Sequence, residues 1–278
     1  MKYSIDTEKY IPRMLQACKI NNVMIDLKEP KTIQDKLAWL NIYDVNPLKC
    51  ICADKIKLHD YSRLILDKDI CIPIIRTYDK AEEINFDELP NQFVLKCNHG
   101  SGMNIIVKDK SELNKEEAIK KLNKWMSTDF AFQNGFEAHY HDINRKCFVE
   151  EYKEVDDKSP FDYKISCFNG KPMLIQVFGD RFNNNRHMNY YDVNFNYVKL
   201  SRRDFVNRPD IKHERPKQLE VMLKYSEQLS KLFKFVRVDF YEIDGRIYLG
   251  EMTFVPGACL FRYATREDEI KVGNLLEL

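Results

Sequence analysis

A hairpin near the end of the chain constrains the fold more than any other stretch of the sequence. Two segments rich in Val, Ile, Phe and Tyr lie on either side of Asp244-Gly245, a pair that favours a tight turn between antiparallel strands. On the first segment Arg237 and Asp239 are two residues apart, so their side chains share one face of a strand. Glu251 lies on the second segment. Whether it joins the same face depends on the turn.

The turn has two solutions. A strict two-residue turn pairs Asp239 with Gly250, and Glu251 then points to the opposite face. A three-residue loop over residues 243–245, with its glycine in the left-handed region, pairs Asp239 with Leu249. Glu251 then lies diagonally across on the same face, about 7–8 Å away between Cα atoms. One metal ion can bridge a gap of that size.

We predict the three-residue loop, because it also places Arg237 and Thr253 on the carboxylate face and Met252 with the apolar residues. Two carboxylates and an arginine on one face suit Mg²⁺ and phosphate, since the cation prefers hard oxygens and the guanidinium offers the anion a planar pair of donors. An exposed sheet face with a cross-strand ion pair is the alternative. The spacing alone leaves both interpretations open.

Composition argues against several classes of protein. The 278 residues are 44% hydrophobic, enough for a sizeable core in two domains or in one domain with subdomains. Lys plus Arg (44) nearly balances Asp plus Glu (43), so the net charge of +1 gives no reason to expect a nucleic-acid binder or a polybasic membrane anchor. The eight cysteines lie mostly in apolar segments without a zinc-site spacing, which predicts reduced thiols in a cytoplasmic protein. The polar N-terminus and the lack of long apolar runs predict neither a signal peptide nor a membrane span.

The N-terminal part of the chain is expected to be mostly helical. Thr32 is a suitable N-cap for a helix over residues 32–40, and the acidic stretch at residues 82–90 is the best domain boundary. Much later, residues 216–233 form an amphipathic pattern typical of a helix that leads into the hairpin.

A glycine-rich loop follows the predicted strand at residues 93–97. Lys96 lies on that strand, and Gly100-Ser101-Gly102 precede a second strand at residues 105–107. Backbone N–H groups of such a loop can reach phosphate oxygens, and the lysine supplies positive charge. The pattern lacks the GKS or GKT of a Walker motif, and an ordinary glycine hairpin is the alternative interpretation.

Residues 147–152 and residues 183–216 each have one functional and one purely structural interpretation. The strand at residues 147–152 ends in acidic residues, either as the hinge of a nucleotide pocket or as a solvated strand terminus. A hairpin around Asn169-Gly170 carries Lys164, and the polar, basic stretch at residues 183–216 is either a lid that meets anionic groups or a solvated loop.

Several of these motifs carry a family resemblance that extends over nearly the whole chain. They are residues 93–102, 162–172, 236–241 and 250–254, with Asp35-Lys36-Leu37 and Ala53-Asp54-Lys55 near the N-terminus. In this order they resemble the ATP-grasp superfamily, specifically its TupA-like branch, which is found with cell-surface polysaccharide genes. The resemblance is most specific in the last motif and least specific in the glycine loop.

The resemblance implies an α+β ATP-grasp fold, in which two α+β subdomains grip ATP between antiparallel sheets. A smaller, mostly helical N-terminal region would occupy residues 1–90. The small subdomain with the glycine loop would span residues 91–152, and the C-terminal subdomain with the metal site would span residues 153–278.

The resemblance also implies roles for individual residues. Mg²⁺ would be held by Asp239 and Glu251, with Thr253 where many ATP-grasp enzymes have Asn, a departure that puts the second metal's ligands in doubt. The implied catalytic residues are Arg237, Lys96 and Arg181. The implied substrate-binding residues are Arg76, Arg181 and Arg186. The implied ATP-binding residues are Lys96, His99, Gly100, Ser101, Gly102, Asn104, Glu150, Glu151, Tyr152 and Lys164.

The implied chemistry is an ATP- and Mg²⁺-dependent carboxylate–amine ligation. A carboxylate attacks the γ-phosphate of ATP, and an amine then displaces phosphate from the acylphosphate. By analogy the carboxylate belongs to a uronic acid or amino acid of a cell-surface polysaccharide precursor, met in the cytoplasm or, if lipid-linked, at the inner membrane face. A sugar kinase on the same fold and a non-catalytic nucleotide- or glycan-binding module are the alternatives. Oligomeric state is left open.

Overall fold

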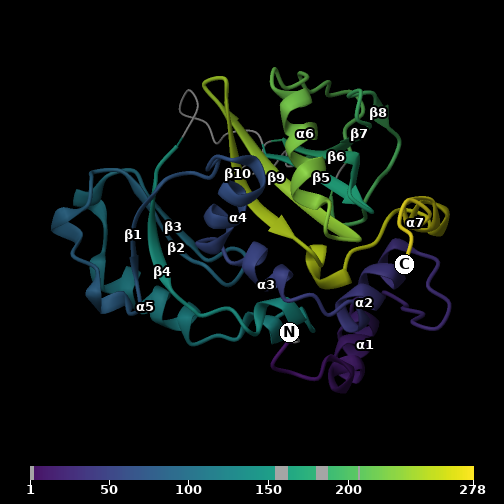
Figure 1. Ribbon diagram of the computed structural model, residues 1–278, viewed down its shortest axis with the longest axis horizontal. Helices are drawn as coiled ribbons and strands as arrows, with labels where there is room; N and C mark the ends of the chain where they lie inside the picture. Colours follow the sequence, from purple (N-terminus) through teal and green to yellow (C-terminus); the bar gives the residue numbers. More distant parts are fainter. Residues whose placement is uncertain (1–2, 154–161, 180–186, 206) are drawn as a thin grey trace.

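The computed structural model describes residues 3–153, 162–179, 187–205 and 207–278, and within them the chain forms two antiparallel sheets with helices around them (Figure 1). The smaller sheet contains, in spatial order, β1 (Ile74–Tyr78), β4 (Cys147–Glu151), β2 (Phe93–Cys97) and β3 (Asn104–Val107). The larger sheet contains, in spatial order, β10 (Arg246–Thr253), β9 (Phe235–Ile243), β5 (Asp162–Phe168), β6 (Lys171–Gly179), β7 (His187–Tyr191) and β8 (Tyr197–Val198).

The helices surround these sheets. The α-helices are α1 (Ile11–Ile20), α2 (Ile33–Tyr43), α3 (Leu48–Ala53), α4 (Lys57–Leu66), α5 (Lys115–Met126), α6 (Leu219–Ser230) and α7 (Arg266–Gly273). Short 3₁₀ helices are η1 (Thr7–Tyr10), η2 (Ala81–Glu83), η3 (Phe86–Glu88), η4 (Lys110–Glu112), η5 (Phe130–Phe132), η6 (Ala138–Tyr140) and η7 (Pro256–Cys259). No helix among the described residues is both long and apolar enough to cross a bilayer.

The N-terminal region is helical, as predicted, and its best-defined helix begins where the sequence indicates. Thr32 caps α2, because its hydroxyl accepts the N–H of Asp35 at 3.1 Å while the Asp35 carboxylate accepts the N–H of Thr32 at 2.8 Å. This reciprocal capping box satisfies two backbone donors that a bare helix start leaves unpaired. The predicted helix at residues 216–233 is also present, as the shorter α6.

The expected boundary at residues 82–90 does not separate the sheets. β1 precedes it in the chain, yet β1 pairs along its length with β4 in the smaller sheet. The N-terminal region therefore contributes an edge strand to the sheet that carries the glycine loop. The division into three regions at residues 90 and 152 stays a prediction.

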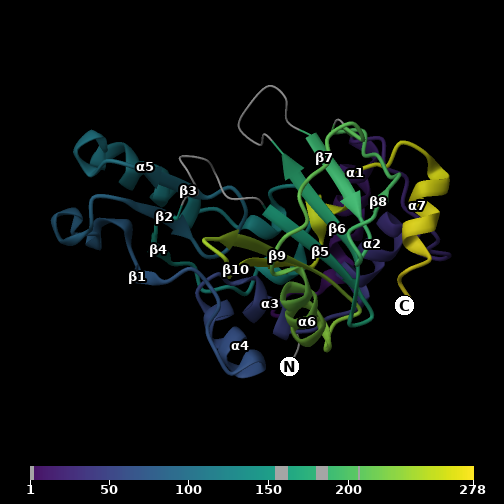
Figure 2. The same cartoon turned by 90° about the horizontal axis from the view of Figure 1, so that it is seen from above.

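The larger sheet has one apolar face and one polar face. Its apolar face packs on α6, which lies against β5, β6 and β9 (Figures 1 and 2). Val236, Val238, Ile165 and Cys167 point to this side and are fully buried. Burial of these side chains fixes the alternation along β5 and β9, because a shift by one residue would expose them all. The residues between them are thereby held on the other face, which carries Asp162, Lys164, Arg237 and Asp239.

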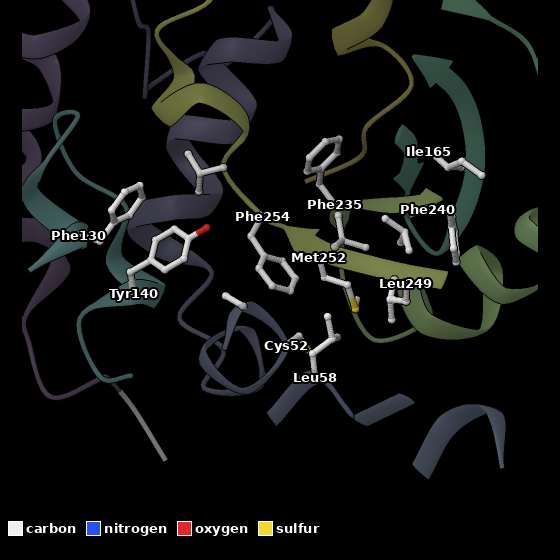
Figure 3. Packing of buried hydrophobic residues seen from close by; sticks show 14 of the residues in the cluster. Cys52, Leu58, Phe130, Tyr140, Ile165, Phe235, Phe240, Leu249, Met252 and Phe254 are labelled. Atoms are coloured by element: carbon white, nitrogen blue, oxygen red, sulfur yellow. The ribbon is translucent and has the colours of Figure 1, made fainter. Parts of the chain in front are cut away.

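The return strand β10 packs on helices from the N-terminal region. Figure 3 shows Leu249 and Met252 pointing toward Cys52 and Leu58 of α3 and α4. At the edge of the sheet, the N–H of Leu249 donates to the carbonyl of Ile70 at 2.8 Å. The N-terminal helices are therefore attached to the strand that carries Glu251.

Candidate active site

The hairpin of β9 and β10 turns at two residues, so the predicted three-residue loop is wrong. Ile243 pairs directly with Arg246, and the two residues between them, Asp244 and Gly245, have φ angles of 50° and 71°. Two consecutive positive φ angles are typical of the turn whose twist matches that of the flanking strands. A regular ladder from this turn would pair Asp239 with Gly250.

A bulge between Leu249 and Glu251 changes that outcome. Gly250 is left out of the pairing, Glu251 lies directly opposite Asp239, and Thr253 lies opposite Arg237. The shared face was therefore predicted correctly, although by the wrong route. A side chain at Gly250 would meet the ring of Tyr241, because its Cβ would lie 2.8 Å from Cε2. Glycine is suited to a bulge where another group comes this close to the backbone.

Arg237 contacts three other residues of the polar face. Its Nε and Nη2 donate to the two carboxylate oxygens of Asp239, each at 2.7 Å. Nη2 also lies 3.1 Å from Glu251 Oε1 and 3.1 Å from Thr253 Oγ1. A planar guanidinium can make these contacts at once, whereas a single ammonium cannot.

Lys164 completes the cluster from the neighbouring strand β5. It pairs in register with Asp239, and its ammonium contacts Asp239 Oδ2 and, at 2.8 Å, Asp162 Oδ2. The side chains of Asp162 and Asp239 are only 3% and 2% exposed. Such buried carboxylates need paired charges, and the two basic residues supply them.

The surroundings shift the pKa values of this cluster in different directions. Burial raises the pKa of Asp239 to about 6, although Arg237 and Lys164 act to lower it. Burial would also raise the pKa of Glu251, but the charges of Lys55, Lys164 and Arg237 outweigh burial and lower it. Near neutral pH both carboxylates are therefore ionised and able to bind a cation.

The glycine loop lies between β2 and β3, as predicted. Gly102 has a φ of 73°, a conformation that other residues rarely adopt. Gly100 packs against Phe130, and a Cβ there would lie 2.6 Å from the ring. Ser101 and Gly102 are exposed at the tip of the loop. Each glycine is thus required by a local contact or conformation.

A family comparison agrees with this arrangement. The model of the TupA-like ATP-grasp family matches residues 35–277, which is most of the chain. The chain belongs to this family. None of the curated proteins compared with the chain matches it.

Several solved structures similar to this ATP-grasp protein are described as ligases or synthetases. A D-alanine–D-alanine ligase from Bacillus anthracis complexed with ATP is 20% identical with a TM-score of 0.45, over 88% of this chain and 72% of that one. Another structure of the ligase from Bacillus anthracis is 22% identical with a TM-score of 0.43, over 75% and 58%. D-alanyl-alanine synthetase A from Vibrio cholerae is 15% identical with a TM-score of 0.48, over 81% and 64%. The chain thus spans less than two thirds of the length of two of these three structures.

The predicted ATP-binding residues of this ATP-grasp protein fall into two groups. Lys96 and Glu150 lie on adjacent strands, and the Lys96 ammonium is 2.5 Å from Glu150 Oε1. Glu151 and Tyr152 line a cavity of about 480 Å³ at the far end of the same sheet, together with Ile75, Pro90, Asn91 and Gln92. The predicted hinge residues Glu151 and Tyr152 and the glycine loop therefore lie at opposite ends of β2 and β4.

Two of the predicted ATP-binding residues have structural settings of their own. His99 is 1% exposed, and its Nε2 lies 3.1 Å from the carbonyl of Trp125 in α5. Burial lowers the pKa of His99, so the ring is neutral near pH 7, and it connects the start of the glycine loop to α5. Asn104 is exposed and pairs with Lys96 at the start of β3.

Of the predicted substrate-binding arginines, the structure describes only Arg76, and Arg76 does not lie at the cluster. Arg76 lies on edge strand β1, is exposed, and forms an ion pair with Glu88 at 2.6 Å. Arg181 and Arg186 lie outside the described residues. Their proposed contacts with a substrate stay predictions.

One residue of the site was missed by sequence reasoning. Lys55, from the turn between α3 and α4, lies 2.6 Å from the carbonyl oxygen of Gly100 and 3.7 Å from Glu251 Oε2. Its motif Ala53-Asp54-Lys55 carries part of the family resemblance, which implies no role for the lysine. The sequence does contain one indication of a role, because Lys55 is a charged residue inside a family motif and the sequence gives no structural reason for it.

Proposed function

We propose that this protein is an ATP- and Mg²⁺-dependent ligase that joins a carboxylate to an amine through an acylphosphate. The observation that carries the proposal is the cluster of Arg237, Asp239 and Glu251 on one face of the larger sheet. A module that only binds glycans has no need of two carboxylates, one of them fully buried, around a shared guanidinium. Membership of the TupA-like ATP-grasp family supports the same reading.

The phosphates of ATP would lie between the glycine loop and this cluster. Backbone N–H groups of the loop suit phosphate oxygens, and Lys96 and Lys164 add positive charge from strands of the two sheets. Adenine and ribose would lie toward Glu151 and Tyr152, whose cavity has room for them.

The acidic residues fit a divalent ion. Asp239 and Glu251 face one another from adjacent strands and offer hard carboxylate oxygens, which Mg²⁺ prefers. Their charges are balanced by three basic residues, Arg237, Lys164 and Lys55, and phosphates would engage these when the ion arrives. When bound, Mg²⁺ would neutralise charge on the phosphate oxygens and so ease attack by an anion.

The chain's own residues would then stabilise two successive transfers. A carboxylate oxygen of the acceptor forms a bond to the γ-phosphorus, the bond to the bridging oxygen of ADP breaks, and Arg237 balances charge on the transferred group. An amine next attacks the acylphosphate carbon and displaces phosphate, losing one proton. By analogy with the TupA-like branch, the acceptor is a uronic acid or amino acid of a cell-surface polysaccharide precursor.

The test is phosphate release from ATP with Mg²⁺, against a panel of uronic acids and amino acids as acceptors. Each reaction is run with an amine panel and separately with hydroxylamine, which traps an acylphosphate as a hydroxamate detectable by mass spectrometry. The control is the double variant Asp239→Asn/Glu251→Gln, which keeps the shape of the site without its negative charges.

The products distinguish the candidate functions. Equal amounts of ADP, phosphate and amide, with a hydroxamate in the trapping reaction, would establish the ligase. A phosphorylated sugar without free phosphate would identify a kinase. A thermal shift with Mg²⁺ and ATP that is equal in the wild type and the double variant would contradict the metal site.

A further inference from the structure

Lys55 links three parts of the molecule that are far apart in the sequence. It leaves the turn between α3 and α4, donates to the carbonyl of Gly100 at 2.6 Å, and approaches Glu251 Oε2 to 3.7 Å. Its side chain is only 17% exposed. A lysine from the N-terminal helices thus reaches both the glycine loop of the smaller sheet and a carboxylate of the larger sheet.

The backbone of Lys55 is fixed to the start of the glycine loop. Its N–H donates to the carbonyl of Asn98 at 3.1 Å, and the preceding Asp54 accepts the side-chain amide of Asn98 at 2.9 Å. Asn98 is 1% exposed, and its side chain also bonds the backbone of Asn144 and Lys146. This buried network holds the main chain of Lys55 in place while leaving its flexible side chain free to change partners.

The two oxygens of Glu251 have different basic partners. Oε1 contacts Arg237 and Thr253 within the larger sheet, whereas Oε2 lies 3.7 Å from the ammonium of Lys55. A divalent ion bound by Glu251 would be repelled by an ammonium that stays at this distance. The divalent ion and the Lys55 ammonium therefore compete for the carboxylate of Glu251.

We propose that Lys55 is a catalytic residue that exchanges Glu251 for the terminal phosphate of ATP when nucleotide and divalent ion bind. The inference rests on the proposed function and adds a residue from the N-terminal region to the reaction. Gly100 belongs to the loop proposed to cover the phosphates, so the ammonium beside its carbonyl lies next to where they would bind. Lys55 would then neutralise charge on the γ-phosphoryl oxygens as the acceptor carboxylate attacks, and it transfers no proton itself.

The exchange predicts opposite effects on two ligands. Lys55→Met keeps the length of the side chain but removes the competing charge. Mn²⁺ alone should bind this variant several-fold more tightly than the wild type. The Mg²⁺ complex of AMP-PNP should bind about 10- to 100-fold more weakly, because a charge-assisted contact to the terminal phosphate is lost. Mg²⁺–ADP lacks that phosphate and should lose no affinity in the variant.

Three controls make the result specific. Lys57 is exposed and lies two residues after Lys55 in the chain. Lys57→Met therefore removes an equal charge outside the site and should change none of these affinities. Lys55→Arg keeps the charge and should recover part of the AMP-PNP affinity if Lys55→Met lowers it. Thermal melting of each variant checks that the fold is retained.

The outcomes separate this inference from the proposed function. If the wild type binds AMP-PNP and Lys55→Met binds it equally well, Lys55 does not contact the terminal phosphate and the inference is overturned. A parallel loss of Mn²⁺ and AMP-PNP binding would indicate a purely structural lysine and would overturn it too. If the wild type binds no nucleotide, the proposed function itself fails.

Discussion

Glu251 lies directly opposite Asp239 across β9 and β10, although a regular ladder from the Asp244-Gly245 turn would place Gly250 there. The bulged residue Gly250 makes the difference, because it inserts one position that has no partner. Two carboxylates are thereby brought onto one face of the sheet around the guanidinium of Arg237.

Removing the charge of Asp239 should harm both stability and ion binding. In Asp239→Asn, Arg237 and Lys164 lose the carboxylate that they share, whose side chain is 2% exposed, and keep only Glu251 and Asp162 as partners. Breaking a buried pair in this way costs about 3–5 kcal/mol of unfolding free energy. Urea unfolding and Mn²⁺ titration of the variant measure the two effects.

Glu251→Gln is the matched comparison for Asp239→Asn. In the wild type the Glu251 side chain is 26% exposed. It lies 3.1 Å from Arg237 and 3.7 Å from Lys55, farther than the 2.7 Å between Asp239 and Arg237. The loss of unfolding free energy should be smaller, about 1 kcal/mol, while Mn²⁺ binding should be lost to the same extent. Equal stability losses in the two variants would contradict the assigned difference in burial and pairing.

Arg237→Lys should separate binding from chemistry. A lysine keeps the charge but cannot contact Asp239, Glu251 and Thr253 together, as the guanidinium does. Because the proposed role of Arg237 is to stabilise charge in the transition state, kcat for phosphate release should fall by about 100-fold or more, with a much smaller change in KM for ATP. Arg246→Lys, at an exposed position of the same hairpin, is the control. A change confined to KM would argue against the assigned role.

The two glycines of the glycine loop should respond differently to alanine. In Gly100→Ala the new Cβ would lie 2.6 Å from the Phe130 ring and 3.0 Å from Met103 Sδ, so the loop must shift. The expected cost is about 1–3 kcal/mol, together with weaker nucleotide binding, because the carbonyl that Lys55 contacts moves.

In Gly102→Ala the new Cβ meets no atom within 4 Å, but the backbone has a φ of 73°. The expected cost is about 1 kcal/mol from backbone strain alone, with the loop position unchanged. Comparison of thermal stability with AMP-PNP affinity in the two variants tells the two causes apart. Equal nucleotide affinities would show that the Phe130 contact does not position the loop.

Local signals in the sequence were sufficient for much of the fold. The Asp244-Gly245 and Asn169-Gly170 pairs predicted their hairpins, because residues that tolerate positive φ are needed at both turns. Thr32 predicted the start of α2, because a hydroxyl at that position can accept a backbone N–H. Each of these features depends on residues within a few positions of one another.

The remaining features depend on contacts that no short pattern records. The bulge at Gly250 goes with the burial of Met252 in the core and with the close approach of Tyr241 across the hairpin. The position of Lys55 beside Glu251 requires α3 and α4 to dock on β10. Reasoning from alternation alone therefore placed the two carboxylates on one face but chose the wrong turn, and it left Lys55 without a role.

A buried glutamate near the site should make stability depend on pH. Glu137, just before η6, is 5% exposed, and burial together with the charge of Glu251 raises its pKa from 4.5 to about 8. The folded protein therefore holds this proton between about pH 4.5 and 8, whereas the unfolded chain releases it. Because the folded state binds the extra proton, its stability falls as pH rises through this window, by about 1.4 kcal/mol per pH unit.

Glu137→Gln removes this dependence, because glutamine is nearly isosteric and does not titrate. Urea unfolding of the wild type and the variant at pH 5.5, 6.5 and 7.5 gives the difference in unfolding free energy at each pH, and other titrating groups cancel in that difference. The variant should gain stability relative to the wild type by about 1.4 kcal/mol for each unit of increase. A difference that stays constant over this range would show that Glu137 is already ionised in the folded protein, and its burial beside Glu251 would then need a cationic partner.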